Sequence, residues 1–254
     1  MESHIKRKLL ALAAASVLVA GCGGGGGDSA PPPPAAATSA EGLYSGTTTT
    51  GRTVTGLVLD DGTYYVLYSS VGSSTAIAGV VQGTGTSNAG TFSSSNARDF
   101  NLEGLGVLSA SVSASYVARQ SLNGTVSYSA GGITSFSSTY DAGYDAVPSL
   151  TTLAGTFSGQ VASSAGAENA TVTLSAAGAI SGSGASGCAV SGSAAPRARG
   201  NVFNISLTFG GAPCLFANQT LSGIAYFDAA AKRLYAAAPN AGRTDGVLFV
   251  GVKP

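Results

Sequence analysis

The sequence predicts an all-β fold: two small antiparallel up-and-down β-barrels that follow a signal peptide and a flexible tether. The first observation is composition, because charged residues make up only 9% of the chain and strong helix formers such as Lys and Glu are scarce. The second is a period-two alternation of apolar and polar residues, typical of strands with one buried face. The third is a set of short motifs that recur in two halves of the chain. A pair of β-sandwiches is the alternative architecture.

Residues 1–21 have the pattern of a secretory signal peptide. Lys6, Arg7 and Lys8 supply a positive start, and the apolar run that follows covers residues 9–20. This run is shorter than the ~20 residues that a membrane-spanning helix needs. We therefore expect this segment to be removed during export.

The end of the apolar run, Val19-Ala20-Gly21-Cys22, resembles the lipobox of bacterial lipoproteins. The resemblance implies that Cys22 becomes the mature N-terminus and carries a diacylglyceryl thioether and an N-acyl chain such as palmitate. Several acyl chains hold a protein on a membrane far longer than one chain does. Gly23 follows where the family's inner-membrane retention signal has Asp, so the resemblance implies a lipid anchor in the outer membrane, facing the periplasm or the cell surface.

Residues 22–41 form a tether rich in Gly and Pro. Five glycines at 23–27 predict a flexible coil, and four prolines at 31–34 predict a stiffer polyproline II spacer. A plain spacer explains this composition. The Cys followed by polyglycine also resembles the start of surface-displayed β-barrel lipoproteins such as transferrin-binding protein B and factor H binding protein, which implies a surface-exposed binding module.

Two stretches show the alternation that predicts half-buried strands. In the first, apolar side chains on one face oppose serines 109, 111, 113 and 115 on the other; they are Leu108, Ala110, Val112, Ala114 and Tyr116. In the second, Phe203, Ile205, Leu207 and Phe209 alternate with Val202, Asn204, Ser206 and Thr208. Gly62 and Gly178 lie between short strand-like runs and predict tight hairpins. About 100 residues accommodate roughly eight strands, and barrel closure removes their edges.

Short motifs divide the chain into a first β-domain at 42–147 and a second at 148–254. Tyr44-Ser-Gly matches Phe157-Ser-Gly, Gly62 matches Gly178, and Val81-Gln-Gly matches Val190-Ser-Gly. Gln120-Ser-Leu-Asn-Gly matches Gln219-Thr-Leu-Ser-Gly and is the strongest pair. This order favours a duplication over chance similarity, and residues 141–148 then form the linker.

The residue types that carry most catalytic chemistry are scarce in this sequence. The single His is His4, inside the predicted signal peptide, so a mature chain has no Ser-His-Asp or Cys-His mechanism and no His metal site. The charge balance is not that of a nucleic-acid-binding protein. The sequence therefore predicts a non-enzymatic protein with no cofactor, no metal site and no nucleic-acid partner.

Two pairs of residues are candidate sites. Cys188 and Cys214 are the cysteines left when Cys22 is lipidated, and in an oxidising compartment we expect them to form a structural disulfide. Tyr64 and Tyr65 follow the predicted hairpin at Gly62 and are the first choice for an exposed binding pair. Tyr is also common in half-buried strands, which is the alternative explanation.

Opposite charges separate the two halves. The first β-domain has six acidic and three basic residues, and the second has three acidic and six basic residues. A basic second half favours an anionic glycan or lipopolysaccharide partner. Attraction between the two halves is the competing explanation.

The leading functional hypothesis is an outer-membrane-anchored lipoprotein that serves as a binding or structural module of the envelope, with a protein or anionic glycan partner. A hydrolase that uses a pair of carboxylates on envelope glycans is the second, because such chemistry needs no His. A carrier of small ligands is the third; inward-facing alanines such as Ala110 and Ala114 leave room for a cavity.

Overall fold

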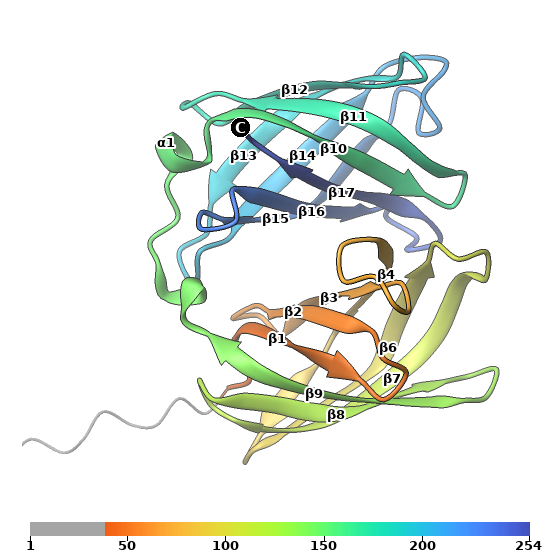
Figure 1. Ribbon diagram of the computed structural model, residues 1–254, viewed down its shortest axis with the longest axis vertical. Coiled ribbons are helices and arrows are strands. Elements are labelled where there is room, and N and C mark those ends of the chain that lie inside the picture. Colours follow the sequence, from red (N-terminus) through yellow and green to blue (C-terminus); the bar gives the residue numbers. More distant parts are fainter. Residues whose placement is uncertain (1–38) are drawn as a thin grey trace, which may run out of the picture. The chain divides into compact units, whose positions relative to one another are not determined.

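A computed structural model describes residues 39–254, which form two closed antiparallel β-barrels joined by a short connection (Figure 1). The predicted signal peptide, Cys22 and nearly all of the predicted tether lie outside the described residues. The first barrel contains β1 (Gly42–Thr48), β2 (Thr53–Val58), β3 (Thr63–Ser69), β4 (Ile77–Thr84), β5 (Thr86–Asn88), β6 (Thr91–Asn101), β7 (Gly106–Val117), β8 (Ser121–Tyr128) and β9 (Ile133–Asp141).

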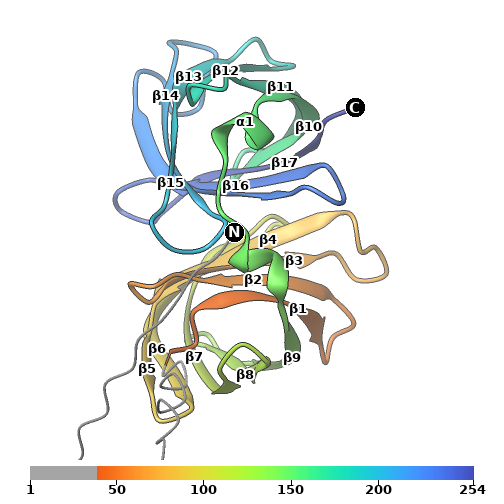
Figure 2. The ribbon, with the colours of Figure 1, turned by 90° about the vertical axis from the view of Figure 1, so that its left-hand side faces the viewer.

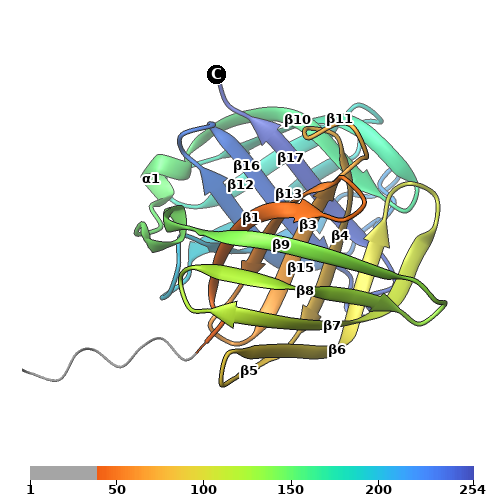
Figure 3. The same ribbon diagram turned by 60° about the horizontal axis from the view of Figure 1, so that its bottom comes forward.

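Neighbouring strands of the first barrel are mostly neighbours in sequence, and β1 pairs with β9. Figure 3 shows β9, β8, β7, β6 and β5 following one another across the sheet. The barrel closes through pairing of β4 with β6, and the short β5 adds only to the edge of β6. This up-and-down order matches the prediction for the first half.

The second barrel closes through pairing of its first and last strands. Its strands are β10 (Gly155–Ser163), β11 (Gly166–Leu174), β12 (Ala179–Gly184), β13 (Ala189–Pro196), β14 (Phe203–Phe209), β15 (Thr220–Asp228), β16 (Arg233–Pro239) and β17 (Gly246–Val252). Two short helices, η1 (Ala142–Asp145) and α1 (Leu150–Leu153), precede it. Neither helix in this described range has the length and apolar character of a membrane-spanning segment.

The predicted all-β class and the barrel architecture are confirmed, and the sandwich alternative is wrong. In β7 the inward side chains Ala110, Val112 and Ala114 are buried while the intervening serines are exposed. In β14 the predicted apolar face also points inward, although Val202, assigned to the polar face, is fully buried between the barrels. Gly62 and Gly178 have φ values of 80° and 85°, the left-handed conformation that these hairpins need.

Each barrel is filled at the end where its first strand begins. In the first barrel Ala40 is fully buried, its backbone N–H donates to Ser87 Oγ at 2.9 Å, and its carbonyl accepts from Tyr44 Oη at 3.0 Å. In the second barrel α1 covers the corresponding end, with Leu153 buried in the core (Figure 2). Access to either interior is therefore from the opposite end.

Lys253 holds α1 against the second barrel. Its ammonium donates to the carbonyls of Thr152 at 2.7 Å and Ala154 at 3.2 Å, where the short helix ends. The same Nζ lies 4.6 Å from the centre of the Phe227 ring, within cation–π range. These contacts fix the plug at the closed end of the barrel.

Three of the four recurring motifs occupy equivalent places in the two barrels. The hairpin glycines show this best: Gly62 O accepts from Gly85 N at 2.9 Å, and Gly178 O accepts from Ala194 N at 2.7 Å. The fourth motif does not correspond. Gln120 precedes β8, the seventh strand of its barrel when the short edge strand β5 is not counted, and Gln219 precedes β15, the sixth strand of its barrel. The duplication itself stays a prediction.

The two barrels share an apolar interface. Its buried members come from the outer face of β1–β4 and β6, from η1, and from the second barrel; they are Leu43, Leu57, Leu59, Tyr65, Leu67, Val80, Phe100, Tyr144, Val202, Ile224, Tyr226, Ala237 and Leu248. These strands are covered on both faces, since their alternate residues fill the first barrel. An interface of this kind favours a fixed arrangement over independent domains.

Charge complementarity adds to this interface. Arg197 pairs with Asp60 at 2.6 Å and with Asp61 at 3.3 Å, and Arg199 pairs with Glu41 at 2.7 Å. Arg243 donates to the backbone carbonyl of Gln82 at 2.6 Å. The opposite charges of the two halves therefore attract one another, which leaves less of the basic second half for an anionic partner.

The predicted linker at 141–148 is partly ordered by this interface. Asp141 caps η1 by accepting from Gly143 N at 2.8 Å, and Tyr144 is buried and donates to Glu41 Oε1 at 3.0 Å. Val147, by contrast, is 86% exposed. Preferred proteolytic cleavage at this connection stays a prediction, and we now expect the cleavage site to lie after η1.

Candidate ligand cavities in the two barrels

The first barrel encloses a cavity of about 700 Å³, a volume common for small-molecule sites. Apolar and aromatic side chains form most of its wall, among them Tyr44, Tyr64, Phe92 and Leu122. The β1–β2, β6–β7 and β8–β9 connections also border it, through residues such as Leu105 and Gly131. The opening of the cavity therefore lies at the end away from the start of β1.

A buried carboxylate stands on the wall of this cavity. Asp99 is only 2% exposed, and its two oxygens accept from Tyr68 Oη at 2.8 Å and from Tyr128 Oη at 2.9 Å. Asn101 Nδ2 donates to Tyr68 Oη at 3.1 Å. Each of these residues is close to the end of its strand, so the polar cluster lies near the opening and the apolar residues lie deeper.

An irregularity in β6 brings Asp99 inside. Phe92 and Ser94 point inward, and the register with β7 then shifts between Ser94 and Ala97. After this bulge the odd-numbered residues Ala97 and Asp99 face the interior. A regular strand would have placed Asp99 outside, because a one-residue shift exchanges the two faces.

Glycines in β4 make room for the tyrosines of β3. Tyr68 pairs with Gly79, and Tyr64 pairs with Gly83. A Cβ on Gly79 would lie 2.3 Å from Tyr68 Oη, and one on Gly83 would lie 2.4 Å from Tyr64 Oη. The rings therefore lie across the glycines, which lets Tyr68 reach Asp99 on β6 beyond β4.

Arg52 stands beside the polar cluster near the opening. Its guanidinium lies 5.4 Å from the centre of the Tyr68 ring and pairs with Glu103 at 2.7 Å. A further bond to the carbonyl of Ser69 at 2.9 Å fixes its position. The charge of Arg52, which lines the cavity, is thus balanced by Glu103, which does not line it.

Burial dominates the electrostatics of this cluster. It raises the pKa of Asp99, although hydrogen bonds from Tyr68 and Tyr128 and the charge of Arg52 act in the opposite direction. Burial and the neighbouring Asp99 carboxylate also raise the pKa of Tyr68 and of Tyr128. At neutral pH both tyrosines are therefore hydrogen-bond donors.

The second barrel encloses a cavity of about 400 Å³. Aliphatic and phenylalanine side chains from most of its strands line it, including Val172, Leu207, Leu234 and Phe249. The β10–β11, β12–β13 and β14–β15 connections border it. Its opening is thus at the end opposite α1.

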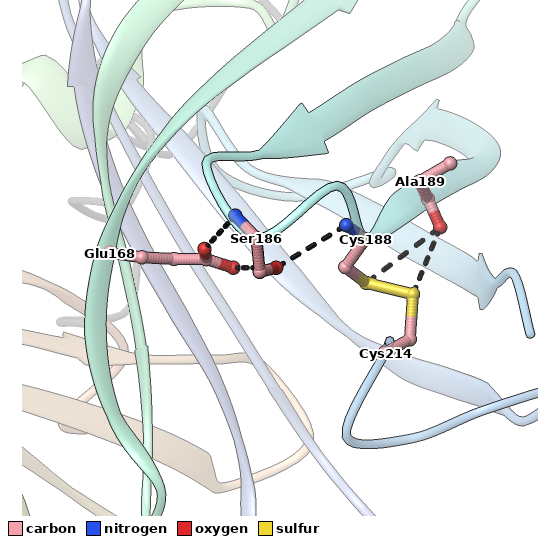
Figure 4. Close-up of a disulfide and its surroundings, with 5 residues drawn as sticks. All are labelled: Glu168, Ser186, Cys188, Ala189 and Cys214. Atoms are coloured by element: carbon pink, nitrogen blue, oxygen red, sulfur yellow. Dashed lines mark hydrogen bonds between the residues drawn. A yellow bond between two sulfur atoms is a disulfide. The ribbon is translucent and has the colours of Figure 1, made fainter. Parts of the chain in front are cut away.

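The predicted disulfide between Cys188 and Cys214 is confirmed, and it joins two of the connections at this opening (Figure 4). Glu168 secures the same region by accepting from the backbone N–H of Ser186 at 2.6 Å and from its hydroxyl at 3.0 Å. Ser186 Oγ in turn accepts from Cys188 N at 3.3 Å. The disulfide therefore restrains the loops at the mouth of the second cavity.

The other predicted site residues have different outcomes. Tyr64 and Tyr65 are 2% and 6% exposed, so the expectation of an exposed pair is wrong. Successive strand residues point to opposite faces, which sends Tyr64 into the first cavity and Tyr65 into the interface between the barrels. A binding role for Tyr64 stays a prediction, and Cys22 lies outside the described residues.

The acidic side chains bear on the hydrolase hypothesis. Among the described residues, Asp99 is the acid that lines the first cavity and Glu168 the one that lines the second. Two carboxylates facing one substrate are needed for glycoside hydrolysis, and neither cavity brings such a pair together. Residues 39–254 also contain no group of three or more His, Cys, Asp or Glu side chains that could hold a metal ion.

Comparisons with known proteins gave no family model and no curated protein that matches this chain. Among solved structures, transferrin-binding protein B from serogroup B Neisseria meningitidis is similar at 10% identity, over 80% of this chain and 66% of that one, with a TM-score of 0.28. A single-substitution variant of the vaccine antigen transferrin-binding protein B from Haemophilus parasuis Hp5 is similar at 10% identity, over 83% of this chain and 67% of that one, with a TM-score of 0.26.

Proposed function

We propose that this protein is a lipid-anchored binding module of the outer membrane whose barrels hold small, largely apolar molecules. The observation that carries this proposal is the pair of cavities, of about 700 and 400 Å³. An eight-stranded barrel is wide enough to hold one small ligand, and burial of apolar ligand surface against such walls supplies affinity. Among the three functions considered from the sequence, the ligand carrier is the one that needs these cavities.

The lipobox-like segment supports the location. A lipid at Cys22 would attach the chain through residues 22–38, and the described part enters the first barrel at its closed end, next to Ala40. The opening of the first cavity is at the other end of the strands. The described chain therefore enters the first barrel at the end opposite the cavity opening. We also propose display on the cell surface and a protein partner, on the basis of the polyglycine tether that follows Cys22.

Cavity-filling substitutions test the proposal with a neutral apolar fluorophore, N-phenyl-1-naphthylamine. The full chain with Cys22→Ala serves as the parent, because removal of the lipid attachment site avoids detergents that compete for the cavities. Val112→Phe fills the first cavity and Ala170→Phe the second, since both side chains line their cavities. The matched controls are Ser111→Phe and Thr171→Phe, on the exposed faces of the same strands.

We expect saturable binding to the parent chain and to both controls. Each filled variant should lose the sites of one cavity, and the double variant should lose both. Binding that both filled variants retain in full, in chains with unchanged far-UV circular dichroism, would refute the proposal. Absence of saturable binding to the parent chain would refute it as well.

A further inference from the structure

The polar cluster of the first barrel indicates which small molecules its cavity selects, an inference that rests on the proposed function. We propose that this cavity takes an apolar molecule with one ammonium group, and that the ammonium binds Asp99. Three properties of the cavity wall favour such a ligand: its charge balance, the free acceptor positions of the carboxylate and the aromatic surroundings.

The charge balance of the cavity wall favours a cation. Asp99 and Arg52 are the charged residues that line it. Arg52 has its own counterion, Glu103, at 2.7 Å. The Asp99 carboxylate receives two hydrogen bonds, but both come from neutral tyrosine hydroxyls. An ionised Asp99 is thus the one charge of this wall without an opposite charge in direct contact, and a buried charge of this kind favours a cationic partner.

The carboxylate has capacity for an additional donor. Two carboxylate oxygens offer about four acceptor positions. Tyr68 and Tyr128 each occupy one position and hold the carboxylate in a fixed orientation. A ligand ammonium, with three donors, can use a remaining position without displacing either tyrosine.

The aromatic rings around the cluster also favour a cation. Tyr44, Tyr64, Tyr68 and Tyr128 line this cavity, and the π face of a tyrosine attracts cations. Tyr68 already shows this preference, because the Arg52 guanidinium lies over its ring at 5.4 Å. The deeper wall, which includes Val81, is apolar. A ligand with an ammonium head and an apolar body therefore matches both regions.

The second cavity is the internal contrast. Its acidic side chain, Glu168, lies at the opening and is only half-buried, so water can solvate its charge, and the rest of the wall is largely aliphatic. We expect no preference for a cation there. Preference for ammonium should therefore belong to the first cavity alone.

A matched set of probes tests the proposal. 1-Naphthylmethylamine, 1-naphthylmethanol and 1-naphthoic acid share an apolar body and carry a positive, neutral and negative group at pH 7.5. Their affinities are measured by titration calorimetry on the full chain with Cys22→Ala and Ala170→Phe, so that the second cavity is filled. The amine should bind at least tenfold more tightly than the alcohol, equivalent to about 1.4 kcal/mol, and the acid should bind most weakly.

Two variants separate the role of Asp99 from a general effect of the cavity. Asp99→Asn keeps the shape of the side chain and should bring the affinity for the amine to within about twofold of that for the alcohol. Arg52→Gln should instead increase the preference for the amine over the alcohol, because it removes the cation next to the cluster and leaves Glu103 unpaired. This second variant keeps the test decisive if Asp99→Asn does not fold.

The possible outcomes distinguish the two proposals. Equal binding of all three probes, abolished by Val112→Phe, overturns the ammonium inference and leaves the proposed function intact. A preference for the amine that persists in Asp99→Asn, or that decreases in Arg52→Gln, also overturns the inference. If no probe binds, both the inference and the proposed function fail.

Discussion

Removal of the disulfide is the perturbation whose size follows most directly from the structure. The double substitution Cys188→Ala and Cys214→Ala opens a loop closed by residues 26 apart in sequence. In the chain-entropy model this loop closure stabilises the folded state by about 3.5 kcal/mol. For a cooperative unit of roughly 200 residues, such a loss lowers the midpoint of thermal unfolding by about 7 to 14 °C.

The interface determines how the loss is distributed between the barrels. Because Tyr65 and Leu67 pack against Ile224 and Leu248 in one buried cluster, we expect both barrels to unfold as one unit. This expectation differs from that for two independent domains, in which the first barrel would not respond to the disulfide. The chain has no Trp, and eight of its ten tyrosines lie at residues 42–147, so tyrosine fluorescence reports mainly on the first barrel.

The assay follows thermal unfolding by tyrosine fluorescence and by far-UV circular dichroism in parallel. Both transitions should move down together in the double variant. Addition of reductant should reproduce the shift in the wild type and leave the double variant unchanged. A shift equivalent to less than about 1 kcal/mol would refute the loop-entropy reasoning. A circular-dichroism transition that splits while the tyrosine transition stays in place would refute the coupling through the interface.

Three further predictions concern Asp99, Gly79 and Cys22. Because the pKa of Asp99 is raised in the folded protein, protonated Asp99 stabilises the fold below its ordinary pKa of 3.8, and this stabilisation is lost as the pH rises through the raised pKa. The free energy of unfolding, measured in urea, should therefore decrease with increasing pH in the wild type relative to Asp99→Asn. Parallel pH profiles of the two proteins would contradict this. Gly79→Ala should lower the free energy of unfolding by ~1–3 kcal/mol, because the added Cβ displaces Tyr68. The control Gly56→Ala, whose Cβ would have its nearest neighbour at 3.5 Å, should lower it by less than half as much. Equal losses of stability would argue against the packing described. Cys22→Ala should release the protein from the membrane fraction, and its retention after a carbonate wash would refute the lipid anchor.

Sequence reasoning was most successful where one local pattern decides the structure. Alternation in residues 108–116 identifies the inward face of β7, because successive side chains of a strand point to opposite sides. Gly62 and Gly178 mark hairpins because few other residues adopt positive φ there. The disulfide followed from the count of cysteines and the expected compartment.

The central residues of the candidate site were missed. Asp99 is charged and lies in a strand, and simple alternation from Phe92 places it on the outer face. A pattern in the sequence could have indicated the inward-facing tyrosines, since Tyr64 and Tyr68 have the same spacing as Gly79 and Gly83, their partners across the β3–β4 hairpin. It becomes meaningful only when the register of the two strands is known.

The amino-acid sequence is therefore sufficient to predict the fold class, the faces of regular strands such as β7, the tight turns and the cross-link, because each depends on residues close in the chain or on a count. Tertiary structure decided which outward faces are buried, where β6 shifts register, and that both barrels retain cavities. Burial of Tyr65 requires the second barrel to cover β3, and the inward turn of Asp99 requires a bulge matched to β7. A cavity depends on how side chains from many strands meet across a closed barrel, and no local stretch of sequence specifies that packing.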